Sequence, residues 1–387
     1  MNRTPYSLAI VASVSIAFAC AQSATNPAMN APDETAWRLF LQVNAAAGGS
    51  NALFETWASD TDTFRPDPQF PSSPSPLRLR PPVVGEQGRL ALQRAGKLLP
   101  QVPPLAGSGE ETRRNLDTFN FIVANKLYKR SGLKAAFGKT LSFPASSIEV
   151  KANWLPVADI PGFTLNRVAA ADVARTFHVN TGADGRQYAL VSMHVISKLV
   201  PNWTWATFEN SYNRGRCDIL GCIDNFGAQP ALVKPAAQAD KGYPACQKSP
   251  ALASLIAVAN WDPAFANYCL KGSQTDFTDS TGLSVRLGNS ITERGFVAQS
   301  SCITCHSRSG WDAKGAATSS AGFDSNGAPL GPVNPAWFWS FTGQPPVFTG
   351  KPGLKQTATS SDFVWSLPFC AIDDSVNPPP PTPCTGK

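Results

Sequence analysis

Methionine and histidine are scarce in this sequence of 387 residues, which holds three of each. The six positions are Met1, Met29, Met193, His178, His194 and His306. Because imidazole and thioether side chains are common ligands of transition metals, any such site must draw on very few residues. The scarcity excludes a chain with several histidine-rich metal centres.

Long apolar runs are also missing beyond the N-terminus. Residues 8–19 (LAIVASVSIAFA) form a run that is too short to span a bilayer, and no later run reaches the roughly 18 residues of a membrane helix. Arg3 precedes the run and Ala19-Cys20-Ala21 offers a cleavage site, so residues 1–21 are predicted to be a signal peptide. The mature protein would be periplasmic or secreted in a bacterium. A lipid anchor on Cys20, and with it an outer-membrane lipoprotein, stays open as the alternative.

Charge is sparse and mostly scattered, at 16% charged residues and a net charge of +6. One basic group stands out: Lys126, Lys129, Arg130, Lys134 and Lys139. No nucleic-acid-binding motif accompanies these charges, so a nucleic-acid partner is not expected. The group is interpreted as a solvated helix face, with a docking patch for an acidic redox partner as the alternative.

One short motif carries chemistry. Cys302-Ile303-Thr304-Cys305-His306 fits the C-x-x-C-H pattern of covalent haem c attachment. Two thiols at this spacing can reach the two vinyl groups of one haem, and the adjacent imidazole can then bind the iron. The sequence predicts that Cys302 and Cys305 hold the haem and that His306 is the axial iron ligand. A redox dithiol, a zinc half-site and a plain disulfide are the alternatives.

The scarcity of methionine now matters, because no methionine follows His306. A small cytochrome c module usually has a methionine ligand downstream of its motif, so a sixth ligand must come from upstream. His194 is favoured and Met193 is the runner-up. These neighbours lie on a predicted strand, so they should point to opposite faces. His178 adjoins a predicted turn and is expected to be more exposed.

The sixth position separates two functions. A protein ligand there favours single-electron transfer to an unknown redox partner protein, whereas an open position allows a haem enzyme of the peroxidase or oxygenase type. Glu209 is the nearest candidate for a catalytic carboxylate, but the sequence does not distinguish it from a surface residue. Catalytic residues therefore stay unknown, and whether the chain is an enzyme stays open.

Six further cysteines follow residue 200, at positions 217, 222, 246, 269, 370 and 384. An even set in an exported chain predicts three disulfides, and pairing of neighbours along the chain is the simplest arrangement. A third functional class follows from the same chemistry. It is a disulfide-stapled binding protein without haem, in which Cys302 and Cys305 pair with each other.

Periodicity predicts an α+β fold with a central sheet and a haem-binding C-terminal part. Apolar spacing indicates helices over 33–43 and 111–130, strands over 147–155, 187–200 and 203–208, a helix over 249–270 broken at Pro263, and a short helix over 288–298. The prediction is one large body over 33–370, with a possible subdivision into 33–240 and 245–370. Residues 371–387 form a proline-rich tail. Six aromatic residues after the motif could wall a haem pocket or form ordinary core: Trp311, Trp337, Phe338, Trp339, Phe341 and Trp365.

Several segments resemble an uncharacterised family of exported bacterial cytochrome c family proteins with a single C-x-x-C-H motif. They are residues 147–154 (SIEVKANW), 201–209 (PNWTWATFE), 270–277 (LKGSQTDF), 300–306 (SSCITCH) and 362–366 (DFVWS). The resemblance covers about residues 33–370. It implies one covalent haem held by Cys302 and Cys305, with His306 as axial ligand. Relatives often carry a histidine where this chain has Asn210, and the family supplies no established substrate.

Overall fold

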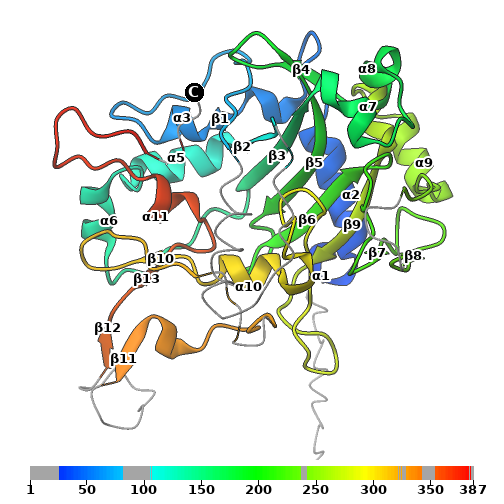
Figure 1. Cartoon of the computed structure of the whole chain (residues 1–387). Helices are drawn as coiled ribbons and strands as arrows, with labels where there is room; N and C mark the ends of the chain where they lie inside the picture. Colours follow the sequence, from blue (N-terminus) through cyan, green and yellow to red (C-terminus); the bar gives the residue numbers. More distant parts are fainter. Residues whose placement is uncertain are drawn as a thin grey trace, which may run out of the picture.

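The computed structural model describes residues 26–81, 105, 107–236, 242–320, 322, 324, 328–341, 354–382 and 384. Its centre is a seven-stranded sheet in which every pairing is antiparallel, as Figure 1 shows. The strand order is β1-β2-β3-β5-β6-β9, and β4 pairs with β5. The bounds are β1 Ala58–Ser59, β2 Gly109–Arg114, β3 Ile148–Pro156, β4 Val179–Thr181, β5 Gln187–Ser197, β6 Thr204–Asn210 and β9 Tyr268–Gln274.

Short helices and three two-stranded ribbons surround this sheet. The helices are α1 Pro27–Asn30, α2 Pro32–Val43, α3 Asp60–Thr63, α5 Leu116–Ala124, α6 Arg130–Ala136, α7 Ile160–Phe163, α8 Val173–Thr176, α9 Pro250–Ala257, α10 Cys302–His306 and α11 Ser366–Cys370. The ribbons pair β7 Cys222–Ile223 with β8 Leu232–Val233, β10 Gly310–Trp311 with β13 Thr359–Ser360, and β11 Trp339–Phe341 with β12 Leu354–Gln356. Within the described residues, no helix combines the length and apolarity needed to cross a bilayer. The α+β prediction is confirmed as mixed helices around an antiparallel sheet.

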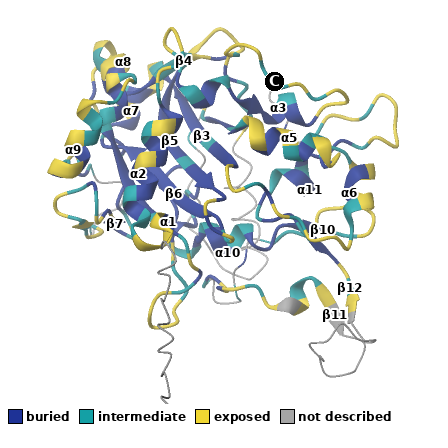
Figure 2. Ribbon diagram, turned by 180° about the vertical axis from the view of Figure 1, so that it is seen from behind, coloured by how far each residue is buried: buried dark blue, intermediate teal, exposed yellow. Residues whose placement is uncertain are grey.

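Helix α2 covers one face of the sheet and forms the main apolar core with it (Figures 1 and 2). Pro32 suits the first helical position, and acidic residues in the first turn favour the helix N-terminus. Trp37 and Phe40 are fully buried, and Phe40 stacks on Phe208 of β6 with ring centroids 4.2 Å apart. The predicted helix over 33–43 is confirmed, because its apolar spacing matches a real layer of the fold.

The opposite face of the sheet is polar and nevertheless buried. Cross-strand pairing places Lys151 beside His194, and His194 beside Thr207. On the same face, Glu149 and Asn153 of β3 are 5% and 1% exposed. The sequence predicted a half-buried strand here, with its polar side in water. That expectation is wrong, because segments 287–309 and 359–372 cover this face as a second layer and bond to its polar groups.

Two predicted helices are only partly right. The predicted helix over 111–130 begins as β2, and α5 starts only after Asn115, whose side chain accepts from the backbone N–H of Thr118. Residues 249–270 divide into α9, a 3₁₀ turn at Pro263–Asn267 and the start of β9. The predicted short helix over 288–298 is also largely wrong, because residues 290–296 form turns and only the 3₁₀ helix Val297–Gln299 follows them. Each error lies where tertiary partners stabilise a backbone that local spacing does not favour.

The three disulfides join neighbours along the chain, as predicted: Cys217–Cys222, Cys246–Cys269 and Cys370–Cys384. The third brings the proline-rich tail back to α11, where Cys384 is 7% exposed. The tail also bonds to the start of α6, since Arg130 pairs with Asp373 at 2.9 Å. The tail is therefore held to the body at both ends, at residues 371–374 and at Cys384, whereas most of the described residues between them are exposed.

Candidate functional site

A pocket lies between the polar face of the sheet and helices α10 and α11. The cavity has a volume of about 150 Å³ and opens to solvent. Its apolar walls include Ile196, Trp205, Leu287, Phe296, Trp365 and Phe369. Its polar walls include Arg80, Glu110, Thr112, Glu149, Lys151, His194, Thr292 and Glu293. Cys302, Cys305 and His306 complete the lining, so all three residues of the predicted attachment motif face one pocket.

Helix α10 presents these three side chains because another residue anchors it. Ile303 is fully buried in a second apolar core and fixes how the helix rotates about its axis. Residues three positions apart lie on the same side of a helix, so Cys302 and Cys305 share one side. Both thiols are unpaired, whereas the other six cysteines of the described residues form disulfides. The motif is therefore held in a geometry that leaves both sulfur atoms available.

His306 is oriented by the backbone of a distant segment. Its Nδ1 lies 2.8 Å from the carbonyl oxygen of Phe363, and a carbonyl only accepts, so the proton sits on Nδ1. This arrangement leaves the lone pair on Nε2, as in many metal-binding histidines. Trp205 packs against the ring, with centroids 4.6 Å apart. Burial lowers the pKa of His306 to about 4, so the ring is neutral and able to bind a metal at neutral pH.

The two thiols are protonated and uncharged at neutral pH. Burial raises the pKa of Cys305 to about 12 and also raises the pKa of Cys302, and the nearby carboxylate of Glu293 adds to both shifts. A redox-active dithiol needs the opposite, a lowered pKa that supplies thiolate. The environment therefore disfavours the dithiol alternative for this motif.

A loop formed by residues 288–301 carries the opposite side of the pocket, and three buried contacts lock it to the sheet. The backbone N–H and hydroxyl of Ser290 donate to Glu209 at 2.9 and 2.6 Å. Asn289 donates to Thr207, and Thr292 donates to Asn153. Gly288 allows the close approach, because a Cβ there would lie 2.0 Å from Oγ of Ser300. Glu209 is thus fully buried and anchors the loop, so it is not the surface residue that the sequence left open.

The two candidate distal ligands point to opposite faces, as predicted. His194 lines the pocket, and its Nε2 lies 3.3 Å from Oε1 of Glu293. Met193 packs in the core on the α2 face, where its sulfur accepts from the amide of Asn44. Met193 therefore faces away from α10, and the geometry favours His194.

His178 is fully buried, which corrects the expectation that it is exposed. Its ring bonds to two carboxylates, with Nδ1 2.8 Å from Asp262 and Nε2 3.1 Å from Glu55. Burial alone would lower its pKa, but these two hydrogen bonds raise the pKa to about 9. Because both nitrogens are engaged, His178 has no position left for a ligand.

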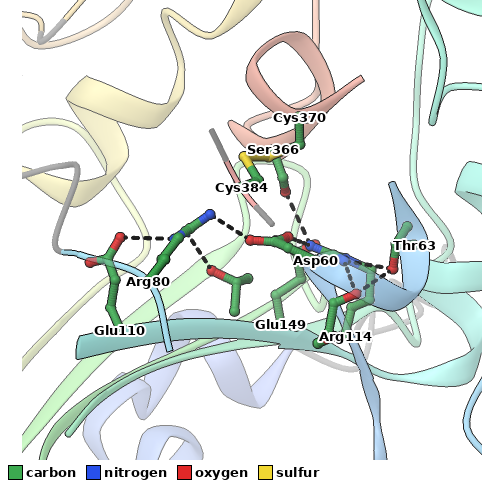
Figure 3. Close-up of a disulfide and its surroundings, with 11 residues drawn as sticks. Asp60, Thr63, Arg80, Glu110, Arg114, Glu149, Ser366, Cys370 and Cys384 are labelled. Atoms are coloured by element: carbon green, nitrogen blue, oxygen red, sulfur yellow. Dashed lines mark hydrogen bonds and ion pairs between the residues drawn. A yellow bond between two sulfur atoms is a disulfide. The ribbon is translucent and has the colours of Figure 1, made fainter. Parts of the chain in front are cut away.

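Along the polar wall of the pocket, a network of buried charges connects α3, β2 and β3 and reaches the C-terminal disulfide (Figure 3). Asp60 pairs with Arg80 at 2.7 Å and with Arg114 at 2.5 Å. Arg114 also pairs with Glu149 at 3.1 Å, and it donates to the hydroxyl oxygens of Thr63 and Ser366 and to the carbonyl oxygen of Ser59. Asp60 lies close to the sulfur atoms of Cys370 and Cys384, but these form a disulfide and cannot act as thiolate metal ligands.

The aromatic and basic residues that the sequence marked as candidates have different roles in the structure. Of the six aromatic residues, Trp365 lines the pocket, whereas Trp311 is buried in the second core and donates to the carbonyl of Leu133. The basic group around α6 is partly neutralised, because Lys129 and Arg130 pair with Asp374 and Asp373. This pairing weakens the case for a docking patch there.

Sequence reasoning missed several residues of the site, above all Glu293, Lys151 and Arg80. Their side chains enter the pocket from segments that are distant in sequence, so no local spacing marks them. Trp205 gave a partial signal, since its stretch of alternating aromatic residues suggested either a strand or an aromatic lining, and it is both. No protein-family model matches the chain, and neither the curated proteins nor the solved structures provide a match.

Proposed function

We propose that this chain is an exported monohaem c-type cytochrome-like protein that transfers single electrons to a partner protein. Cys302 and Cys305 would hold one haem c through thioether bonds, His306 would be the axial ligand and His194 the sixth ligand. A haem bound in this way supplies a one-electron iron couple, with its potential set by the ligands and their surroundings. The family resemblance in the sequence points to the same cofactor.

One observation carries the proposal. Two unpaired thiols and a neutral, backbone-oriented imidazole lie together on one wall of a pocket. The apolar walls, including Trp205, Trp365 and Phe369, suit the large flat surface of a haem. The buried, protonated thiols argue against a redox dithiol, and their unpaired state argues against a stapled protein without haem.

The proposed location rests on the cysteines. Six of them form disulfides, which persist in oxidising compartments such as the bacterial periplasm or the extracellular space. The predicted signal peptide over 1–21 and the possible lipid anchor at Cys20 lie outside the described residues. The partner is proposed only by class, as a redox protein, since no surface of the described chain identifies it.

A haem enzyme with an open distal position is the second candidate. It is favoured by the buried pair of His194 and Glu293, because such a pair can accept and return a proton beside a bound small molecule. The two candidates differ in one property. Carbon monoxide binds to a reduced iron with an open position and leaves a six-coordinate protein-ligated iron unchanged.

The test is a spectrum and a mass measured on protein produced in a host that attaches haem c. We expect a sharp reduced α-band that carbon monoxide leaves unchanged, and a mass gain of one haem that survives denaturation. The double variant Cys302→Ala/Cys305→Ala should lose that covalent mass. The matched control Cys217→Ala/Cys222→Ala removes the same number of sulfur atoms away from the pocket and should keep it. A mature protein without a Soret band would refute the proposal.

A further inference from the structure

We propose that Glu293 positions His194 so that Nδ1 of its ring is the sixth iron ligand. The inference rests on the proposed function and deepens it, because it names the ligating atom and the residue that selects it. Nε2 of His194 lies 3.3 Å from Oε1 of Glu293. Nδ1 of the same ring is buried and has no hydrogen-bond partner among the described residues. An unpartnered buried nitrogen costs free energy unless a ligand uses it.

The carboxylate determines which nitrogen carries the proton. Oε1 of Glu293 faces Nε2 of His194, and a carboxylate oxygen accepts a hydrogen bond, so the proton between the two groups sits on Nε2. In a neutral ring the lone pair is then on Nδ1. Carboxylates fix the tautomer of metal-bound histidines in this way.

Glu293 is itself held in place. Its second oxygen accepts from the backbone N–H of Asn289 at 2.6 Å, and the loop carrying both residues is tied to Glu209 through Ser290. The amide of Asn289 approaches Nε2 only at 3.4 Å and donates to Thr207 at 3.0 Å. Several hydrogen bonds therefore fix the carboxylate of Glu293 relative to His194. Such support is expected for a group that holds a ligand in one orientation.

The test uses haem-loaded protein and reads the ligand atoms directly. The chain has three histidines, so ¹⁵N-histidine labelling gives a simple NMR spectrum of the reduced protein. We expect His306 to be bound through Nε2, His194 to be bound through Nδ1, and His178 to carry protons on both nitrogens. Ligation of His194 through Nε2, or no ligation by His194 at all, would overturn the inference.

Variants of Glu293 distinguish its role in positioning His194 from the effect of its negative charge on the midpoint potential. Glu293→Leu removes the acceptor, so we expect a high-spin reduced iron that binds carbon monoxide. Glu293→Gln keeps an acceptor oxygen and should keep the low-spin spectrum, while its midpoint potential rises because the negative charge is lost. An unchanged spectrum in Glu293→Leu would contradict the proposed role, and if that variant fails to fold, the wild-type NMR spectrum still decides.

Two controls complete the design. Glu149→Gln removes the same charge from the pocket wall without touching His194, so its potential should rise while carbon monoxide still fails to bind. Glu55→Gln alters the other histidine–carboxylate pair, on the far face of the sheet, and should leave both readings unchanged. Wild-type protein without covalent haem would sink the proposed function as well. Covalent haem that binds carbon monoxide in the wild type would sink this inference and favour the haem-enzyme candidate over electron transfer, whereas ligation of His194 through Nε2 would sink this inference alone.

Discussion

His178 and His194 lie on the two sides of the sheet, and each contacts a glutamate at a similar distance. His178, just before β4, is buried against Trp154 and Phe265 of the main core, whereas His194 lines the pocket and its side chain is 11% exposed. His178 meets Glu55 at 3.1 Å and His194 meets Glu293 at 3.3 Å. The difference lies in the second ring nitrogen. In His178 it bonds to Asp262, whereas in His194 it has no partner among the described residues. The comparison teaches that the role of a histidine depends on its second ring nitrogen. Both nitrogens of His178 are hydrogen-bonded, which indicates a structural role, whereas Nδ1 of His194 is still available to bind a metal.

The largest expected effect is a difference in the haem spectrum between a variant on the pocket face of the sheet and a variant on its core face. His306→Ala removes the axial ligand from the pocket face, and we expect loss of nearly all the low-spin haem spectrum, because the iron loses the imidazole beneath it. His178→Gln on the core face should keep the spectrum. Absorbance per protein molecule measures both variants. An equal loss of spectrum in the two variants would show that the faces do not differ in function.

The second prediction concerns stability and pH. His178 has a folded-state pKa of about 9, above the unfolded value of about 6.5, so its charged contacts stabilise the fold fully below about pH 6.5. This contribution of about 3 kcal/mol is lost as the pH rises through 9. The unfolding free energy of His178→Gln should therefore fall below that of the wild type by about 3 kcal/mol more at pH 6 than at pH 10. Urea unfolding at both values measures the gap, and a gap that is independent of pH would contradict the closed charged pair.

The third prediction compares two disulfides in the same way. Cys370–Cys384 closes a sequence separation of 14 and lines the pocket, whereas Cys217–Cys222 closes a separation of 5 away from it. Replacing the first pair by serine should cost about 3 kcal/mol, and replacing the second should cost less because its loop is shorter. Only the first replacement should change the haem spectrum. A spectral change in the second variant would mean that the pocket extends further than its described lining.

The smallest stability effect is expected at His194. His194→Gln keeps a donor for Glu293, so the unfolding free energy should change by about 1 kcal/mol or less. The same variant should open the iron to carbon monoxide. Urea unfolding and a carbon monoxide titration on one sample measure both effects. Large destabilisation with an unchanged spectrum would make His194 a second structural histidine like His178.

Local pattern predicted the parts of the fold that depend on neighbours in sequence. Helix α2, strands β3, β5 and β6, and the three disulfides follow from spacing that a short segment already contains. The environment of His178 could not be predicted, because its partners Asp262 and Glu55 lie 84 and 123 positions away.

The same limit applied to the polar face of the sheet. Alternating charged residues such as Glu149 and Lys151 usually indicate a strand with one side in water. Here a second layer from the C-terminal half covers that side, and the sequence of β3 itself contains no signal for this cover. The attachment motif could be recognised because its chemistry is local, whereas Glu293 could not, because its role depends on a contact between distant segments.

The raised pKa of the Cys302 and Cys305 thiols has a consequence for how the protein is made. The native fold has eight cysteines after residue 200, of which six are oxidised to disulfides and two stay as thiols. The three native pairs close short loops, which favours their formation over longer pairings. Cys302 and Cys305 could still oxidise each other, but burial keeps them protonated, and thiol–disulfide exchange requires the thiolate. In the proposed oxidising compartment, the raised pKa of these two thiols would slow their oxidation and keep both sulfur atoms free for haem attachment.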